Sequence, residues 1–348
     1  MKKNYLQLLL AFVLFTQIGY GQLMDPRDIR LPSFITTSEK AYEFSSMAWW
    51  GDRIVMVPAL KGAMTGTLAP PVTRSIYYIT ADEAAKGIAD GNYEVKLDSI
   101  EVDRASFDFF VKSKPDYDGI EGTAIVGDHF FFVIETKAID NDKCFVARAH
   151  IKNDSKGRPK LVFDKTRPIL KSKTGRDGDQ GFESLVVLPD STLMAVFEFS
   201  EAKGTLFHRL NADLKVVDTG ILPVLKATRK SEKYPKDNRL SEMTSNEGVL
   251  VGINSIFRDV YNSYSELVSF NEKAGKFEAI GSLCLDDCAD NWEGLLRFNN
   301  GWLVLSDNSY GETVDTKLSF FSDQKVIAAS EQKTKPSVVR KPVRKKRK

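Results

Sequence analysis

The chain has 348 residues with 42% hydrophobic content, a formal net charge of +2 and three cysteines. This composition supports a large folded core and excludes a scaffold built from disulfides. The positive excess lies mainly in the C-terminal tail, so the body of the chain is acidic. No aromatic residues alternate with basic ones as in single-stranded nucleic-acid sites, so we expect no nucleic-acid partner.

The N-terminus has the three-part layout of a cleaved secretory signal. Two lysines are followed by an apolar run from Leu6 to Phe15 and by small residues at Gly19 and Gly21. The run is too short to span a bilayer comfortably, and no cysteine follows it that would take a lipid. We therefore predict a bacterial protein that is secreted or periplasmic, begins near Gln22, and is a monomer rather than an integral membrane protein.

The next feature is an internal repeat. A large apolar residue is followed by Glu or Ser, an apolar stretch, a turn, and a second apolar stretch that ends in a polar residue. The first two copies superpose without a gap, which indicates repetition of one structural unit. The five copies span Phe44–Val57, Ile120–Glu135, Phe182–Glu198, Leu240–Asn254 and Trp292–Asp307.

A third strand-like run follows each copy, and in most copies a fourth run follows as well. Four short strands of alternating polarity, separated by Gly, Asn and Asp turns, are typical of a four-stranded antiparallel blade. The sequence thus predicts an all-β fold, a β-propeller of five blades. A sixth blade is the alternative, because the stretch from Tyr78 to Asp118 is long and holds a helix-like insert at residues 81–87. Residues Asp25 to Ser38 are expected to complete the last blade and so fasten the ring.

These boundaries give a signal peptide over residues 1–21, a single propeller domain over 22–331 and a basic tail over 332–348. The tail ends in a run of Lys and Arg between Arg340 and Lys348. Such a tail binds anionic surfaces or simply remains solvated and disordered, and we expect the second.

The first strand of each propeller blade lines the central channel, so the repeated Glu or Ser positions should converge at the axis. Carboxylates brought together in a narrow channel must be protonated, find cationic partners or bind a metal. A ligand set made entirely of oxygen favours Ca²⁺. The predicted calcium ligands are Ser45, Glu121, Glu183, Ser241 and Glu293. In the alternative interpretation, each of these side chains only binds the neighbouring blade.

More polar residues should gather at the same mouth, because the loops that enter the first strand and leave the second lie on one face. Residues before the first strands are Asp118, Asp179, Asn238 and Asp290, and residues after the second strands are Glu135, Glu198, Asn254 and Asp307. Within this acidic funnel, Glu135, Glu198 or Asp307 would orient an attacking water. Arg258 is the candidate for anion recognition.

Other catalytic machinery is hard to assemble from this sequence. The three histidines lie in strand-like runs away from the predicted mouth, so a Ser-His-Asp triad is not expected. No phosphate-binding loop or dinucleotide motif is present. The Cys284 and Cys288 pair fits a local disulfide, two free thiols or, less well, a metal pair, and Cys144 would remain unpaired.

Several short strings resemble the bacterial family known as esterase-like activity of phytase. They are Asp118–Gly122, Gly181–Leu185 with Leu188–Asp190, and Trp292–Leu295 with Leu305–Asn308. The alternation of Ser and Glu at the channel also resembles the calcium-activated nucleotidases (apyrases), whose five-bladed ring holds one axial Ca²⁺. The resemblance implies an axial calcium shell and a hydrolase acting on phosphoester or ester substrates.

Two hypotheses follow from the sequence. In the first, the protein is a secreted calcium-binding propeller hydrolase for a small phosphoester or ester, which uses metal and carboxylate chemistry. In the second, it is a non-enzymatic periplasmic or extracellular binding propeller with a structural axial Ca²⁺ and a partner protein in the cell envelope.

Overall fold

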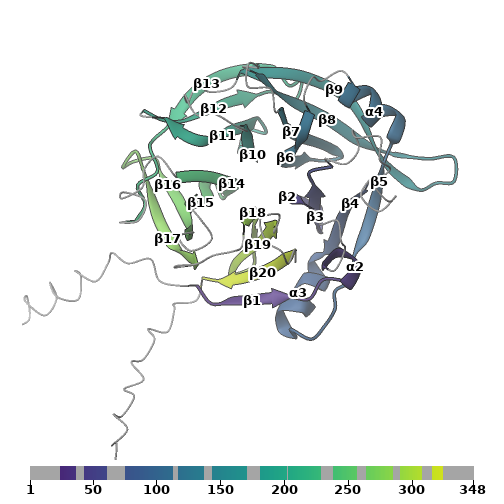
Figure 1. Ribbon diagram of the computed structural model, residues 1–348, viewed down its shortest axis with the longest axis horizontal. Coiled ribbons are helices and arrows are strands. Elements are labelled where there is room, and N and C mark those ends of the chain that lie inside the picture. The colour runs from purple at the N-terminus through teal and green to yellow at the C-terminus, as the bar shows by residue number, and fades with distance from the viewer. Residues whose placement is uncertain are drawn as a thin grey trace, which may run out of the picture.

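Five four-stranded antiparallel blades surround a central axis in the described part of the chain (Figure 1). The computed structural model describes residues 24–36, 43–60, 75–112, 117–136, 143–170, 181–201, 203–228, 238–256, 264–284, 291–307 and 316–323. The predicted five-bladed propeller is confirmed, and the six-bladed alternative is wrong. In the segment between the first and second repeats, helices flank the fourth strand of the first blade.

Within blades 1 to 4, the strand nearest the axis comes first in the chain and the others follow outward. Blade 1 contains β2 (Phe44–Trp50), β3 (Arg53–Pro58), β4 (Ser75–Thr80) and β5 (Asp98–Val102). Blade 2 contains β6 (Tyr117–Val126), β7 (His129–Thr136), β8 (Lys143–Asn153) and β9 (Pro159–Leu170). Blade 3 contains β10 (Phe182–Val187), β11 (Leu193–Glu201), β12 (Gly204–Leu210) and β13 (Val216–Leu222).

Blade 4 contains β14 (Asn238–Asn246), β15 (Val249–Ile256), β16 (Tyr264–Asn271) and β17 (Lys276–Cys284). Blade 5 contains β18 (Asn291–Phe298), β19 (Gly301–Asp307), β20 (Lys317–Ser322) and, on its outer edge, β1 (Pro26–Ile29). The first described strand therefore completes the last blade, as the sequence predicted.

The ring closes at two levels. Near the axis, the five inner strands contact one another in turn, and β18 packs against β2. At the rim, β1 pairs antiparallel with β20, and the Ser319 hydroxyl donates a 2.6 Å hydrogen bond to Asp28. Together these contacts tie the two ends of the described chain into one blade.

The hydrophobic core consists of five layers, one between each pair of neighbouring blades. Strand β3 shows how alternation builds two layers at once. Ile54 and Met56 face blade 5, whereas Val55 and Val57 face blade 2, and all four are fully buried. Because both faces of β3 are covered, the strand is apolar from Ile54 to Val57, and each of these buried side chains contributes about 1.5–3 kcal/mol.

Three helices lie on the outside of the propeller: α2 (Ser33–Thr36), α3 (Ala81–Ala89) and α4 (Arg104–Lys112). Helix α3 occupies the predicted helix-like insert, and Thr80 caps it by accepting a hydrogen bond from the Glu83 amide. It packs so closely on β1 that a Cβ at Gly87 would lie 2.7 Å from the Ile29 side chain. None of the described helices has the length and apolar character needed to cross a membrane.

Gly122 is a test of how tightly the inner strands pack. A Cβ at this position would lie 2.7 Å from the Glu183 carbonyl oxygen and 2.8 Å from the Leu185 nitrogen, both of which belong to the backbone of blade 3. We expect Gly122→Ala to reduce the free energy of unfolding by about 1–3 kcal/mol, because two strands must move apart. Gly91→Ala is the control, since nothing lies within 4 Å of its added Cβ. Equal stability of the two variants in denaturant unfolding would contradict this account.

Candidate functional site

The repeated Glu or Ser position is a β-bulge in every blade. In each inner strand, the pairing with the second strand shifts by one residue at this position, as between Phe182 and Ser184 in blade 3. A bulge releases its extra residue from the regular alternation of the strand and redirects the side chain. The five residues at these bulges are Ser45, Glu121, Glu183, Ser241 and Glu293.

The two serines of this set connect neighbouring blades. Ser45 Oγ donates a 2.6 Å hydrogen bond to the Ile120 carbonyl, and Ser241 Oγ donates a 2.6 Å bond to the Trp292 carbonyl. Each acceptor directly precedes the bulge glutamate of the next blade. These contacts fit the alternative interpretation of the repeat, in which the polar side chain binds the adjacent blade.

A partly buried arginine, which the sequence analysis missed, lies among the glutamates. Arg239 Nη2 lies 3.2 Å from Glu183 Oε2 and 3.3 Å from Glu293 Oε1. Its Nε lies 2.6 Å from Glu198 Oε1, close enough for an ion pair but without hydrogen-bond alignment. Asn291 donates a further 2.6 Å hydrogen bond to Glu293. The guanidinium thus joins carboxylates from blades 3 and 5 to blade 4.

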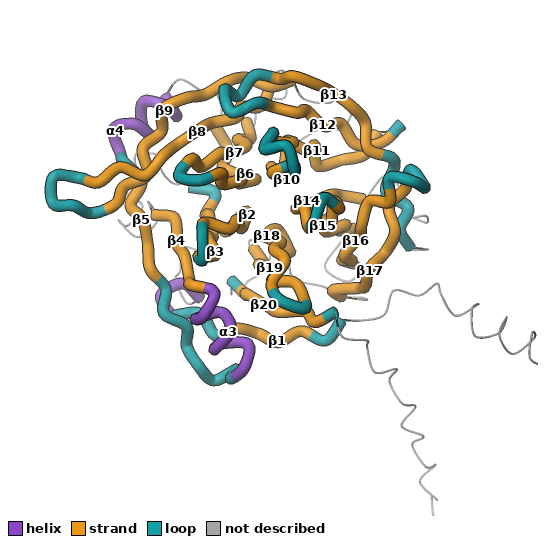
Figure 2. Tube along the Cα trace, turned by 180° about the vertical axis from the view of Figure 1, so that it is seen from behind, coloured by secondary structure: helices purple, strands orange, loops and turns teal. Residues whose placement is uncertain are grey.

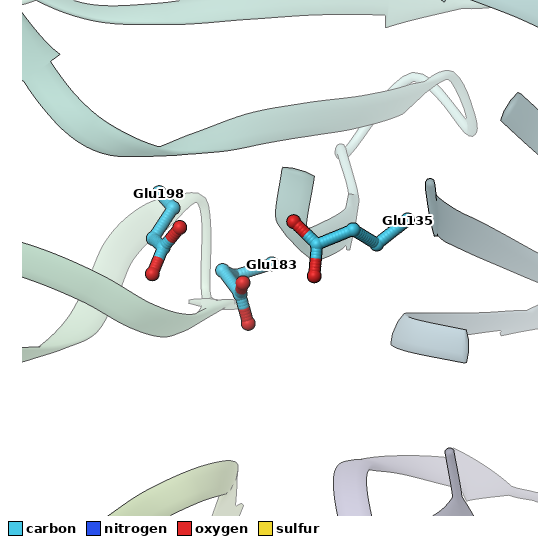
Figure 3. A group of neighbouring side chains, drawn as sticks. All are labelled: Glu135, Glu183 and Glu198. Atoms are coloured by element: carbon cyan, nitrogen blue, oxygen red, sulfur yellow. The ribbon is translucent and has the colours of Figure 1, made fainter. Parts of the chain in front are cut away.

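Three of the carboxylates form a compact group (Figure 3). One oxygen each of Glu135, Glu183 and Glu198 lies within 4.8 Å of the other two, and all three residues are buried. Gly181 makes room for this arrangement, because a Cβ there would lie 2.6 Å from Glu135 Oε1. The group therefore contains one predicted calcium ligand and two predicted catalytic residues.

Burial raises the pKa of Glu198 well above its usual range. Arg239 opposes this rise, while Glu183, Glu135 and Glu293 add to it by repulsion. For Arg239 itself, burial alone would lower the pKa, but the surrounding carboxylates outweigh burial and raise it. The guanidinium is therefore charged, and Glu198 binds a proton more readily than an ordinary glutamate does.

Glu242 is a second residue that the sequence analysis did not select. It follows the bulge residue Ser241 and is 3% exposed. Burial raises its pKa well above the usual range, repulsion from Glu183 and Glu293 adds to the rise, and the hydrogen bond from the Met243 amide opposes it. Blade 4 therefore has a glutamate at this level too, displaced by one residue from the repeat.

A sequence signal for both missed residues exists in blade 4. Arg239 stands two residues before the bulge, where blades 2 and 3 have Gly119 and Gly181. Glu242 stands one residue after the bulge, where blade 2 has Gly122. A charge at a position occupied by glycine elsewhere in the repeat indicates a side chain that projects into space the other blades leave open.

The remaining predicted mouth residues have separate environments. Asp118 and Asn238 are buried at the starts of their strands. Asn254 donates a 2.7 Å hydrogen bond to Glu266 in a buried network of blade 4. The Asp307 backbone pairs with Asn291, but its side chain lies outside the described part of the structure. Also outside it lie Arg258, Asp179 and Asp290.

The cysteine and histidine predictions can be compared with the structure in part. Cys144 is buried and is not part of a disulfide, and Cys284 is disulfide-bonded, whereas Cys288 lies outside the described residues. His208 uses both ring nitrogens in hydrogen bonds, to the Leu170 carbonyl and the Thr219 hydroxyl at 2.9 and 2.8 Å.

Comparison with solved structures finds several chains that are similar to this one. Solved structures with a similar fold include the GH43 endo-arabinanase from Bacillus licheniformis, at 12% identity and a TM-score of 0.43, covering 80% of this chain and 94% of that one. A GH43 β-xylosidase/α-arabinofuranosidase from a compost microbial metagenome has 11% identity and a TM-score of 0.47, covering 87% and 95%. The GH32 β-fructofuranosidase of Bombyx mori has 9% identity and a TM-score of 0.45, covering 91% and 66%. At these TM-scores the likeness adds no argument about function, and the propeller assignment rests on the blades described above.

The predicted family membership is wrong. No protein-family model matches the chain, and no curated protein matches it. The similar solved structures above are glycoside hydrolases, not phytase-like esterases or apyrases. The strings that suggested the resemblance follow from the blade itself, because a bulge glutamate followed by a small residue meets the packing needs of an inner strand, as at Gly122.

Arg239 should be the most sensitive single position of the site. We expect Arg239→Gln to reduce the free energy of unfolding at pH 7 by about 3–5 kcal/mol, because it leaves buried carboxylates without their cation. Arg209→Gln is the control, since it removes a more exposed ion pair with Asp190 and should cost at most about 1 kcal/mol. Denaturant unfolding of both variants measures the difference, and similar small losses would contradict the assigned role.

Glu242 should make stability depend on pH. Its pKa is raised in the folded state, so the folded protein binds a proton more tightly than the unfolded chain does. The resulting stabilisation is complete below the ordinary glutamate pKa and is lost as pH rises through the raised folded pKa. Glu242→Gln mimics the protonated form, so we expect a higher melting temperature than wild type at pH 8 and little difference at pH 4. Glu278→Gln, an exposed change on β17, should have no effect at either pH.

Proposed function

We propose that this propeller is a hydrolase that cleaves a glycosidic bond with carboxylates at its axial mouth. The observation that supports this most directly is the buried group of Glu135, Glu183 and Glu198 with oxygens within 4.8 Å of one another. Glycoside hydrolysis requires two carboxyl groups, one protonated as general acid and one ionised, at about 5–5.5 Å in retaining enzymes. It requires neither a histidine nor a nucleophilic serine.

The environments of two glutamates match these two roles. The raised pKa of Glu198 favours the protonated form that donates a proton to the leaving oxygen. Glu183 lies 3.2 Å from Nη2 of Arg239, a charged donor that can balance negative charge on this side chain. Because the side chain of Arg239 is 19% exposed, the group is not sealed from solvent. We propose Glu198 as the acid and Glu183 as the carboxylate that stabilises or attacks the sugar carbon, with Glu135 as the third member.

The charge of the site favours a neutral substrate over a phosphoester. Among the described residues that form the group, Arg239 is the one cation, and it already contacts three carboxylates. An anionic phosphoester would meet more negative than positive charge there, and its recognition normally uses several Arg or Lys donors. A sugar has no charge and binds through hydroxyl groups, which carboxylates accept readily. We therefore propose a glycoside as the substrate, in place of the phosphoester predicted from the sequence.

Calcium at the axis and export from the cell remain predictions. The oxygens of Glu135, Glu183 and Glu198 are close enough to share one cation, which would supply positive charge. Arg239 contacts two of these three residues and so competes for them. This observation favours a second candidate function, a non-enzymatic binding propeller whose axial carboxylates serve ring stability. The predicted signal peptide, residues 1–21, lies outside the described residues.

Activity of variants on a panel of aryl glycosides tests the proposal. We expect Glu198→Gln and Glu183→Gln each to lower kcat by about 10²–10⁴, since each removes a proton donor or a carboxylate from the reaction. The control is again Glu278→Gln, which should retain wild-type turnover. Full activity of both site variants, or cleavage of aryl phosphates in preference to glycosides, would overturn it. If calcium raises the melting temperature while every glycoside stays intact, the second candidate is correct.

A further inference from the structure

A hollow of about 330 Å³ lies at the rim of the propeller where the ring closes. It is bounded by β1, by β20, by the turn between β18 and β19, and by helix α3, and both views place β1, β20 and α3 side by side (Figures 1 and 2). Glu293 at the axial mouth and Phe298 in the hollow both belong to β18. They are five positions apart in the sequence, which corresponds to about 16 Å of extended strand. The hollow is therefore separate from the axial carboxylates.

The floor of the hollow is aromatic and fixed in place. Phe298 and Phe320 meet edge to face, with ring centroids 6.3 Å apart and planes at 83°. Trp49 stacks on Phe298 at 6.0 Å, so the ring of Phe298 is held from behind. Both phenylalanines are at most 5% exposed. A flat apolar ligand would meet ring edges in the geometry that aromatic pairs prefer.

Helix α3 supplies an aliphatic wall from Ala85, Ile88 and Ala89. The close packing of Gly87 on Ile29 fixes this wall against β1. A hollow of this size lies at the lower limit of small-molecule sites, which suits a ligand with a single ring.

Among the described residues that line the hollow, Arg27 is the one with a charged side chain. No hydrogen bond or ion pair of this guanidinium occurs within the described ranges. Its neighbour Asp28 accepts from Ser319, and successive side chains of a strand point to opposite faces, so Asp28 does not neutralise it. Asn299 and Asn300, whose amides can donate, complete the polar edge. A guanidinium beside amide donors matches a carboxylate.

We propose that this hollow is a binding site for a small aromatic carboxylate, with the ring on Phe298 and Phe320 and the carboxylate on Arg27. The combination of an apolar floor with a single cation at the edge selects this chemistry. The carboxylates of the axial mouth repel an anionic ligand, whereas Arg27 attracts one. An anionic ligand would therefore bind in the hollow at the rim and not at the axis. Because the ligand contacts both β1 and α3, binding stabilises the closed ring.

Phenylacetate is a suitable probe, and its neutral isostere phenylacetamide is the matched control ligand. Isothermal titration of the full chain should show phenylacetate binding at least about tenfold more tightly than phenylacetamide, and phenylacetate should raise the melting temperature. Arg27→Gln should weaken phenylacetate binding about tenfold or more without altering the weak binding of phenylacetamide. Ala85→Leu, which fills the hollow from α3 and keeps Arg27, should weaken both ligands.

Arg104→Gln on α4 is the control variant, because it removes an exposed arginine far from the hollow and should bind phenylacetate as wild type does. The proposal is overturned by absent phenylacetate binding at millimolar concentration in the folded wild-type protein. It is equally overturned by similar affinities for the acid and the amide, or by an unchanged affinity in both Arg27→Gln and Ala85→Leu.

Discussion

The contact between one guanidinium and three carboxylates at the axis is the constraint on which the site depends. Arg239 belongs to blade 4, Glu183 and Glu198 to blade 3, and Glu293 to blade 5. A group of buried glutamates would separate by mutual repulsion if no cation lay among them. The arginine holds them together and also joins three of the five blades at the narrowest part of the ring. Stability and any chemistry at the mouth are thus coupled through the same side chain.

The bulges explain how a repeated strand provides different side-chain functions at one level of the channel. In every blade, the extra residue leaves the strand alternation at the same height. Ser45 uses this position to bind the next blade, whereas Glu183 uses it to reach the axis. At the same bulge position, a serine therefore stabilises the contact between blades and a glutamate reaches the axial site, while the backbone conformation stays the same.

Much of this arrangement could be predicted from the sequence, because every inner strand must pack in the same way and therefore shows the same residue pattern. The five apolar-Glu/Ser copies located every inner strand and bulge, and the polar ends of the second strands located Glu135 and Glu198. Arg239 was missed because it occurs in one blade only, so no repetition revealed it. Short strings around Glu121 and Glu293 suggested a family that the comparisons contradict. Three or four residues that satisfy a common backbone geometry recur in unrelated propellers, and they do not determine ancestry.

The pairing of β1 with β20 has a consequence for the order in which the protein folds. During synthesis, β1 is made before the other described strands, yet its hydrogen-bonding partner β20 is the last of them. Each blade can form from neighbouring strands, but the final blade must wait for a contact between distant ends of the chain, which is slow to form. Until then, one edge of β20 is unpaired and open to strands of other molecules. Ring closure is thus a late step, and its delay sets the period during which the nascent propeller is most exposed to aggregation.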